Sequence, residues 1–233
     1  MPSKDFSKRL HAVIFDLDGT LVDSEVLWTK AMSVMIKDFG KTYDPAFQKN
    51  IMGTPGLVAS ALLKTEYDLP ASVEEIDRRH DESYAEVIKD HLPDPKPGAD
   101  RLLRELHAAA VPIALATSAD RDVAERILVN LGWRSFFREI VVGADVKNGK
   151  PAPDIYLEAA RRMGCVARSC VAFEDSPNGV RSAASAGLVV VGVKDTRYVS
   201  ELPGATLVIT SLEEMSLERL REIIAHELKT HVK

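Results

Sequence analysis

Short apolar, β-branched runs alternate along much of this chain with longer amphipathic stretches. The runs HAVIFDL, VPIALATS, REIVVG, SCVAFED, LVVVGV and ATLVIT each have the length and composition of a buried strand. From residue 99 onward, helical patterns separate most of these runs, and SLEEMSLERLREIIAHELK predicts a final helix. Apolar strands that alternate with helices indicate a parallel sheet covered on both faces, so we predict an α/β fold.

The stretch between residues 24 and 90 has a different pattern, with helical periodicity and no convincing strand. In SEVLWTKAMSVMIKDFG, one helical face would hold Leu27, Ala31, Val34, Met35 and Phe39. Ser72 begins another helical pattern with an acidic first turn, which is typical of a helix N-terminus. We therefore predict a Rossmann-like core of residues 1–20 and 96–233, and an inserted all-helical cap domain with hinges over 21–95. The proline-rich PDPKPGAD would be the linker back to the core.

Composition and charge narrow the classes of function. The chain has 233 residues and a formal net charge of −5, which argues against a general binder of nucleic acid or of anionic membranes. No apolar run approaches the roughly 18 residues of a membrane span, and MPSKDFSKRLHAV lacks the apolar middle of a secretory signal. We expect a cytoplasmic protein. Its oligomeric state stays open, and a monomer is compatible with the sequence.

Cysteine and histidine offer no obvious chemistry. Cys165 and Cys170 do not form a CxxC pair and are expected to be reduced, partly buried thiols. The six histidines show no HxxxH or HExxH spacing, which argues against a histidine-based metal site or a histidine nucleophile–base system.

Polar side chains follow the predicted strands at the edge where an α/β sheet binds its ligands. They come from four separate segments of the chain: Asp16 and Asp18, Thr117 and Ser118, Lys150, and Glu174 and Asp175. Carboxylate oxygens gathered in this way are ligands that suit Mg²⁺ better than Zn²⁺. Lys150 and Ser118 would supply a positive charge and a hydroxyl donor to a phosphoryl group. The first acid could attack phosphorus, and a turn at Gly19 could bring the second acid over the same site as general acid and base.

The motifs DLDGT, TS, GKPAPD and FEDSPNGV resemble, in order, the four motifs of the haloacid dehalogenase-like (HAD) superfamily. The helices at 22–90 look like the small helical cap of that superfamily. DSEVLW, followed by MG and later by EDSPNGVRSAASAG, is most similar to the subgroup containing β-phosphoglucomutase, sugar-phosphate phosphatases and pseudouridine-phosphate phosphatases.

The resemblance implies a role for each matched residue. Asp16 would be the nucleophile that becomes aspartyl-phosphate, and Asp18 the general acid and base. Ser118, beside Thr117, would bind the phosphoryl oxygens, and Lys150 would neutralise nucleophile and phosphate. The metal site would use Asp16, the backbone carbonyl of Asp18, Asp175, and Glu174 directly or through water.

The leading hypothesis is a Mg²⁺-dependent phosphatase acting on a small phosphorylated metabolite, with a sugar phosphate as the first candidate. A phosphomutase like β-phosphoglucomutase is the main alternative. Mutases of the subgroup resemble one another in carrying a histidine at the place of Trp28 and an arginine at the place of Gly56, and this chain has neither. Phosphonate or halide chemistry is a weaker alternative, and a non-catalytic phosphometabolite-binding protein remains a separate class.

Plainer interpretations compete for several of these residues. Ser118 could cap the following helix, and Asp175 could cap the next one. Trp28 is expected to pack at the junction of cap and core, and Asp23 to be a hinge or capping residue. The basic run 78–80 is most simply a solvated helix face. GADVKNGKP resembles a phosphate-binding P-loop, but its spacing is one residue too long and proline replaces the Ser/Thr.

Overall fold

The computed structural model describes residues 10–51, 54, 56–197 and 201–230. The chain divides into two compact units. The sheet unit comprises Met1–Val22 and Pro95–Lys233, and the helical unit comprises Asp23–Asp94. No helix within the described ranges is long and apolar enough to cross a membrane.

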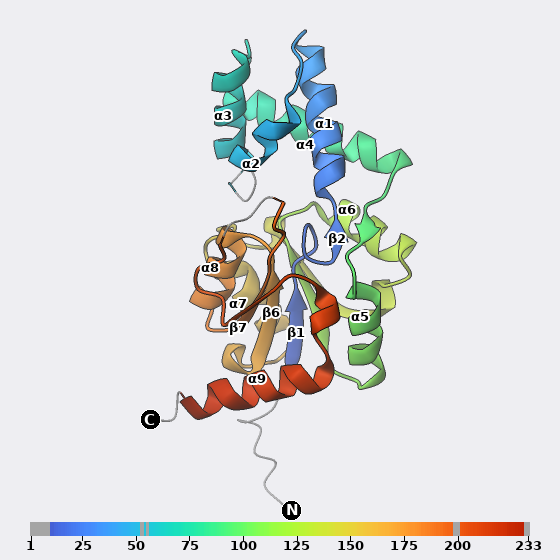
Figure 1. The fold of residues 1–233 in the computed structure, drawn as a ribbon, viewed down its shortest axis with the longest axis vertical. Coiled ribbons are helices and arrows are strands. Elements are labelled where there is room, and N and C mark those ends of the chain that lie inside the picture. The colour runs from blue at the N-terminus through green and yellow to red at the C-terminus, as the bar shows by residue number, and fades with distance from the viewer. Residues whose placement is uncertain (1–9, 52–53, 55, 198–200, 231–233) are drawn as a thin grey trace, which may run out of the picture. The chain divides into compact units, whose positions relative to one another are not determined.

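The sheet unit contains a six-stranded sheet in the order β5-β4-β1-β6-β7-β8. Figure 1 labels the neighbouring strands β1, β6 and β7 of this sheet. All of the strand pairs are parallel. The strands are β1 (Ala12–Phe15), β4 (Ile113–Thr117), β5 (Phe137–Val142), β6 (Cys170–Glu174), β7 (Val189–Val193) and β8 (Leu207–Ile209). Each corresponds to one of the six predicted apolar runs, so the predicted α/β fold is confirmed.

Helices cover both faces of this sheet. Successive strands run outward from β1 to β4 and β5, and then from β6 to β7 and β8 on the other side. Right-handed crossovers therefore place α5 and α6 on one face and α7 and α8 on the opposite face. Small strand residues such as Ala114 and Ala172 lie in the core cluster under α7 and α8, which allows these helices to pack closely. The helices are α5 (Ala99–Ala108), α6 (Arg121–Asn130), α7 (Asp154–Arg162), α8 (Pro177–Ser185) and α9 (Leu217–Thr230).

Single 3₁₀ turns complete the sheet unit and position several loops. They are η3 (Arg134–Phe136), η4 (Gly143–Asp145), η5 (Ala167–Ser169) and η6 (Leu212–Glu214). The last of these corrects a prediction. The final helix begins at Leu217 and not at Ser211, because Ser211 instead caps η6 through a capping box with Glu214.

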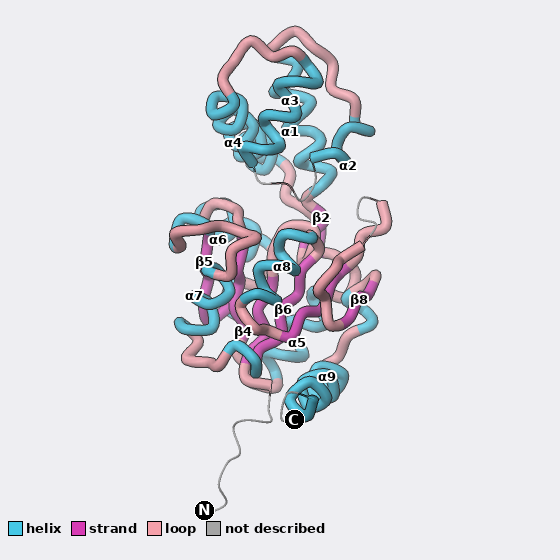
Figure 2. The backbone as a smooth tube through the Cα atoms, turned by 90° about the vertical axis from the view of Figure 1, so that its left-hand side faces the viewer, coloured by secondary structure: helices cyan, strands magenta, loops and turns pink. Residues whose placement is uncertain are grey.

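The helical unit has its own core, and between Ser24 and Pro93 its described residues form no strand; Figure 2 shows helices joined by loops. Its elements are α1 (Glu25–Asp38), η2 (Pro45–Phe47), α2 (Gln48–Ile51), α3 (Gly56–Tyr67) and α4 (Val73–Asp90). The Ser72 hydroxyl accepts a hydrogen bond from the Glu75 amide at 3.2 Å, as predicted for a helix start. The predicted buried face of α1 is wrong at Val34, which is 45% exposed, whereas Met32 and Ile36 are buried.

Two short strands, β2 (Val22–Asp23) and β3 (Asp94–Pro95), pair with each other where the chain passes between the units. The sequence did not predict them. A two-residue strand leaves no measurable periodicity, and proline in a two-stranded ribbon is tolerated only because its nitrogen need not donate.

Candidate active site

Asp16 stands directly after β1, where the strand gives way to a tight loop. Its amide donates to the Phe173 carbonyl at 3.0 Å, which continues the parallel pairing of β1 with β6, and its side chain is buried. The loop then closes through the Gly19 amide, which donates to the Val22 carbonyl at 2.9 Å. Gly19 has a φ of +75°, a conformation that favours glycine, so the turn predicted at this residue is present.

Lys150 brings three strand ends together. Its ammonium nitrogen lies 2.6 Å from Asp16 Oδ1 and 2.5 Å from Glu174 Oε1, and it donates to the Ala116 carbonyl at 3.0 Å. All three ionic side chains are almost completely buried, with Lys150 8% exposed. The loop before α7 therefore delivers its lysine to the carboxyl ends of β1, β4 and β6.

A group of buried carboxylates surrounds this lysine. Asp16, Glu174 and Asp175 each offer an oxygen, and these oxygens all lie within 4.8 Å of one another. The Asp18 carboxylate is not in this group, and the role expected for the Asp18 backbone carbonyl stays a prediction.

Two glycines make room for these carboxylates. A Cβ at Gly19 would lie 2.1 Å from Asp175 Oδ2, and one at Gly179 would lie 1.9 Å from Glu174 Oε2. Both distances are far inside van der Waals contact, so any side chain at either position would displace a carboxylate. Gly19 of DLDGT and Gly179 of SPNGV thus contribute to the site because, without a side chain, they leave space for the carboxylates.

Burial and neighbouring charges shift the ionisation of the site. Burial raises the pKa of Asp16 to about 8. The Lys150 charge and its hydrogen bond oppose this rise, and the nearby Glu174 and Asp18 charges add to it. Burial alone would lower the pKa of Lys150, but the Asp16 and Glu174 carboxylates raise it, so the ammonium form is favoured.

The donor set fits a divalent cation. Three buried carboxylates outnumber the one ammonium group beside them, and all the side-chain donors are hard oxygens. Magnesium and calcium prefer such oxygens, whereas histidine or cysteine ligands would indicate zinc. The chemistry of the residues is thus compatible with the expected metal.

The two residues of the second motif differ in what their hydroxyls can do. Thr117 is buried, and its Oγ1 accepts a hydrogen bond from the Ala119 amide at 3.0 Å. Ser118 is exposed, and within the described residues its hydroxyl has no partner. Ser118 does not cap α6, which begins after Asp120, and α8 is capped by Ser176, so both capping alternatives were wrong.

Two further side chains hold the carboxylates and were missed by sequence reasoning. The Tyr156 hydroxyl, in α7, donates to Glu174 Oε1 at 2.6 Å, and the Thr20 hydroxyl donates to Asp175 Oδ1 at 3.3 Å. Thr20 lies inside the DLDGT motif and could have been suspected. Tyr156 sits within an ordinary amphipathic helix, where a buried tyrosine gives no sign of its partner.

In the helical unit, Trp28 packs face to face on Tyr84, with ring centroids 3.5 Å apart, and against His80 at 4.8 Å. Its expected place at a junction of cap and core stays a prediction. The 78–80 run is only partly a solvated face, because the His80 imidazole lies among these rings and its Nε2 is buried. Of the loop around 52–57, residues 52, 53 and 55 lie outside the described residues.

Comparisons with known proteins agree with these motifs. "Probable pseudouridine-5'-phosphatase" of Drosophila melanogaster is 40% identical over 226 residues, covering 94% of this chain and 96% of the fly protein. "Phosphorylated carbohydrates phosphatase" of Thermotoga maritima is 33% identical, covering 92% of this chain and all of that protein, 100%. Among solved structures, CbbY of Rhodobacter sphaeroides in complex with xylulose-(1,5)bisphosphate superimposes with a TM-score of 0.80 and 27% identity, covering 91% of this chain and 99% of that one.

The model of the family described as haloacid dehalogenase-like hydrolase matches residues 13–193. This match includes every residue of the carboxylate and lysine cluster. The predicted enzyme class, phosphoric monoester hydrolase, is also that of the named phosphatase relatives. The chain therefore belongs to the haloacid dehalogenase-like hydrolase family.

Proposed function

We propose that this protein is a Mg²⁺-dependent phosphatase that hydrolyses a small phosphate monoester, with sugar phosphates as the first candidates, through an aspartyl-phosphate on Asp16. The observation that carries the proposal is the buried ion-pair cluster of Asp16, Lys150 and Glu174, with Asp175 beside it. Buried charges are costly to hold, and an active site is the usual reason for gathering them at strand ends.

In the first half of the reaction, an Asp16 carboxylate oxygen attacks the phosphorus atom and the bond to the leaving oxygen breaks. Lys150 and Ser118 hold the non-bridging phosphoryl oxygens, as a charged and a neutral donor respectively. The Asp18 carboxyl gives its proton to the leaving alcohol oxygen, so that the alcohol departs neutral.

In the second half, a water molecule attacks the phosphorus of the aspartyl-phosphate. Asp18, now ionised, accepts the proton from this water, and the bond between phosphorus and the Asp16 oxygen breaks. Inorganic phosphate leaves, and both aspartates return to their starting states.

Asp16, Glu174, Asp175 and the backbone carbonyl of Asp18 would hold the metal. When bound, Mg²⁺ supplies positive charge that neutralises the phosphoryl oxygens and favours the ionised, nucleophilic form of Asp16. This second effect matters because burial raises the pKa of Asp16 to about 8. Lys150 places a further positive charge 2.6 Å from Asp16 Oδ1.

The helical unit, in this proposal, is a cap that excludes water and selects the leaving group. The substrate class comes from the relatives, whose names refer to pseudouridine 5′-phosphate and to phosphorylated carbohydrates. We propose the same broad class, a small phosphorylated metabolite, for this chain.

The mutase alternative is weakened by the surroundings of Trp28. An indole can donate a hydrogen bond but cannot act as acid or base, and here the ring is stacked on Tyr84 and packs against a tilted His80 ring. A mutase must also hold a second phosphate, and Gly56 offers no cation for it. Hydrolysis is therefore favoured over rearrangement.

The decisive experiment incubates the protein with Mg²⁺ and a panel of esters that includes pseudouridine 5′-phosphate, hexose phosphates and glycerol phosphate. Free phosphate and rearranged phosphosugar are both measured. We expect phosphate release that is lost on chelation of the metal. Asp16→Asn should abolish this release without unfolding the protein, and Asp38→Asn, at an exposed acid in α1, is the matched control.

Two results would contradict the proposal. Full activity of Asp16→Asn would remove the aspartyl-phosphate mechanism. Rearranged phosphosugar with little free phosphate would identify a mutase.

A further inference from the structure

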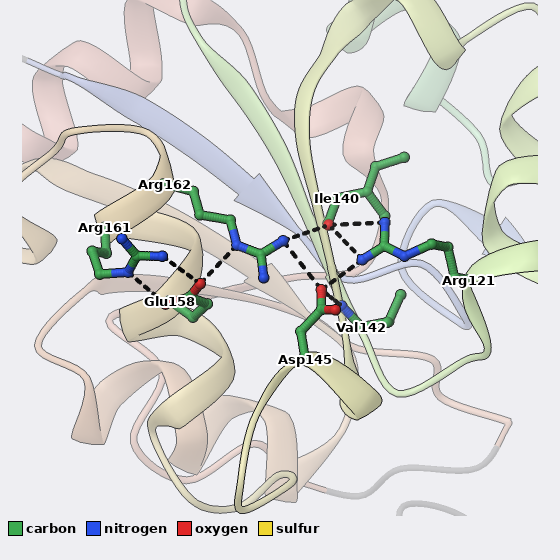
Figure 3. A network of polar contacts seen from close by, with 7 residues as sticks. All are labelled: Arg121, Ile140, Val142, Asp145, Glu158, Arg161 and Arg162. Atoms are coloured by element: carbon green, nitrogen blue, oxygen red, sulfur yellow. Dashed lines mark hydrogen bonds and ion pairs between the residues drawn. The ribbon is translucent and has the colours of Figure 1, made fainter.

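A network of polar contacts joins α6, β5, η4 and α7 on the surface of the sheet unit (Figure 3). At its centre, Asp145 Oδ2 lies 2.6 Å from Arg121 Nη2 and 3.2 Å from Arg162 Nη1. The same oxygen accepts a hydrogen bond from the Val142 amide at 3.2 Å. Both arginines also donate to the Ile140 carbonyl, at 3.3 and 3.4 Å.

The network stands between two of the loops that carry candidate active-site residues. Arg121 is the first residue of α6, three positions after Ser118. Asp145 ends η4, five positions before Lys150. The turn η4 also packs against the second-motif loop directly, because a Cβ on Gly143 would lie 3.7 Å from the Ser118 carbonyl oxygen.

The far end of the lysine loop is fixed separately. Asp154 Oδ1 accepts hydrogen bonds from the Asn148 side chain and backbone amide, at 2.9 and 3.3 Å. The Ser182 hydroxyl of α8 donates to the Ala152 carbonyl at 2.5 Å. These contacts hold the loop on both sides of Lys150, from Asn148 to Ala152, and Asp145 secures the start of the loop at η4.

We propose that Asp145 is a positioning residue. It ties the η4 turn to Arg121 and Arg162, and in this way it holds Lys150 and Ser118 at the relative positions needed to bind one phosphoryl group. The inference rests on the proposed function, since it assigns a role to the geometry of that site. Asp145 itself touches no candidate catalytic group.

The ionic character of the network suits such a role. Partial burial would raise the pKa of Asp145, but the Val142 amide and the two guanidinium groups lower it, so the side chain stays a carboxylate near neutral pH. Arginine presents several donors in a fixed plane. Each of the two arginines therefore contacts both the Asp145 carboxylate and the Ile140 carbonyl. The result is a defined angle between the end of β5 and the start of α6.

Phosphoryl transfer is sensitive to such angles. A displacement of about 1 Å in a catalytic group can lower a rate by about 100-fold. The network lies partly in solvent, with Arg121 42% and Asp145 20% exposed, so its loss should affect stability much less than activity. This difference separates a positioning role from a purely structural one.

The test compares three variants with the wild-type protein. Asp145→Ala removes every contact of the carboxylate. Asp145→Asn keeps an oxygen for the Val142 amide but loses the charge. Glu158→Gln is the matched control, because Glu158 bonds Arg161 and Arg162 in the same network without contacting η4 or α6 (Figure 3).

Three quantities are measured for each: kcat and KM with the best ester and Mg²⁺, the Kd for inorganic phosphate, and amide hydrogen exchange over residues 143–150. We expect kcat/KM to fall about 10- to 100-fold in Asp145→Ala and less in Asp145→Asn, with weaker phosphate binding. Exchange over 143–150 should accelerate in Asp145→Ala. Glu158→Gln should match the wild type in all three.

Wild-type kcat/KM and exchange in Asp145→Ala would overturn the proposal, as would equal losses in Asp145→Ala and Glu158→Gln. A wild-type protein that hydrolyses no ester would instead contradict the proposed function. In that case hydrogen exchange alone decides whether Asp145 holds the loop, and unchanged exchange would overturn this inference too.

Discussion

The sheet unit and the helical unit both bury ionisable side chains, but they surround them differently. In the sheet unit, Asp16 and Glu174 share one buried lysine, and Glu174 also accepts from a tyrosine. In the helical unit, the Glu25 carboxylate accepts from Gln48 at 3.0 Å, and the buried His80 Nε2 has no hydrogen-bond partner.

This difference separates two uses of a buried polar group. Charges held against each other at strand ends can change partner when a ligand enters, and that is what a catalytic site requires. A neutral imidazole among aromatic rings can only become charged at a cost. We therefore expect substitutions in the two regions to change stability and activity in different ways.

Lys150→Met, in the sheet unit, should lower both stability and activity more than any other substitution considered below. Removing the cation leaves Asp16 and Glu174 buried against each other, so we expect the free energy of unfolding to fall by about 3–5 kcal/mol in the presence of a chelator. Activity should fall by about 10²- to 10³-fold. Urea unfolding and steady-state kinetics measure these effects. Lys147→Met, at an exposed lysine of the same loop, should change neither.

The next effect is a pH dependence of the helical unit. Burial lowers the pKa of His80 to about 4, with Asp77 opposing, whereas an unfolded chain binds this proton near pH 6.5. Between these values the unfolded state binds more protons than the folded state. The contribution of His80 to the free energy of unfolding is therefore fully present above pH 6.5 and is lost as the pH falls toward 4. The loss should reach about 2–3 kcal/mol.

His80→Phe tests this expectation, since it keeps a ring beside Trp28 and removes the ionisable group. Urea unfolding of both proteins between pH 7 and pH 4 should show a smaller decline in the variant. Parallel declines would mean that His80 is not the group responsible.

A smaller effect should distinguish two glycines of similar backbone conformation, Gly19 with φ +75° and Gly40 with φ +72°. A Cβ at Gly40 meets nothing within 4 Å, whereas one at Gly19 meets the Asp175 carboxylate. Gly40→Ala should cost about 1 kcal/mol of conformational strain. Gly19→Ala should cost about 1–3 kcal/mol more and lower kcat/KM, because Asp175 must move. Equal losses would show that the carboxylate is not held where the structure places it.

The smallest effect is expected at Arg78, which bonds Glu75 and Glu82 on the surface of α4. Ion pairs in water contribute little, because solvent and salt screen them. Arg78→Ala should therefore leave the thermal unfolding temperature unchanged within error. A clear decrease would mean that exposed pairs support the helical unit more than its apolar core suggests.

Much of the sheet unit could be predicted because its signals are local. A buried parallel strand is a short apolar run, and the residue that follows it must lie at the sheet edge. Asp16, Glu174 and Asp175 were found in this way, and Lys150 was found by its place before the next helix, in GKPAPD. The structure brings the four side chains together. Their catalytic roles stay predictions.

What the sequence did not reveal depends on contacts between distant segments. Tyr156 and Asp145 look like ordinary surface or helix residues until the fold places them beside Glu174 and Arg121. Val34 was assigned to the wrong face of α1 because several apolar residues compete for one face, and only packing chooses between them. The final helix was extended too far because a capped 3₁₀ turn has the same composition as a first helical turn.

The two arginines on the Ile140 carbonyl have a further consequence for association between chains. β5 is an edge strand, and an edge with open carbonyl groups is a template to which a second chain can add by hydrogen bonding. Here guanidinium groups already occupy one of these acceptors, and the opposite edge, β8, has only three residues. Both borders of the sheet are thus less open to the addition of a strand from a second chain.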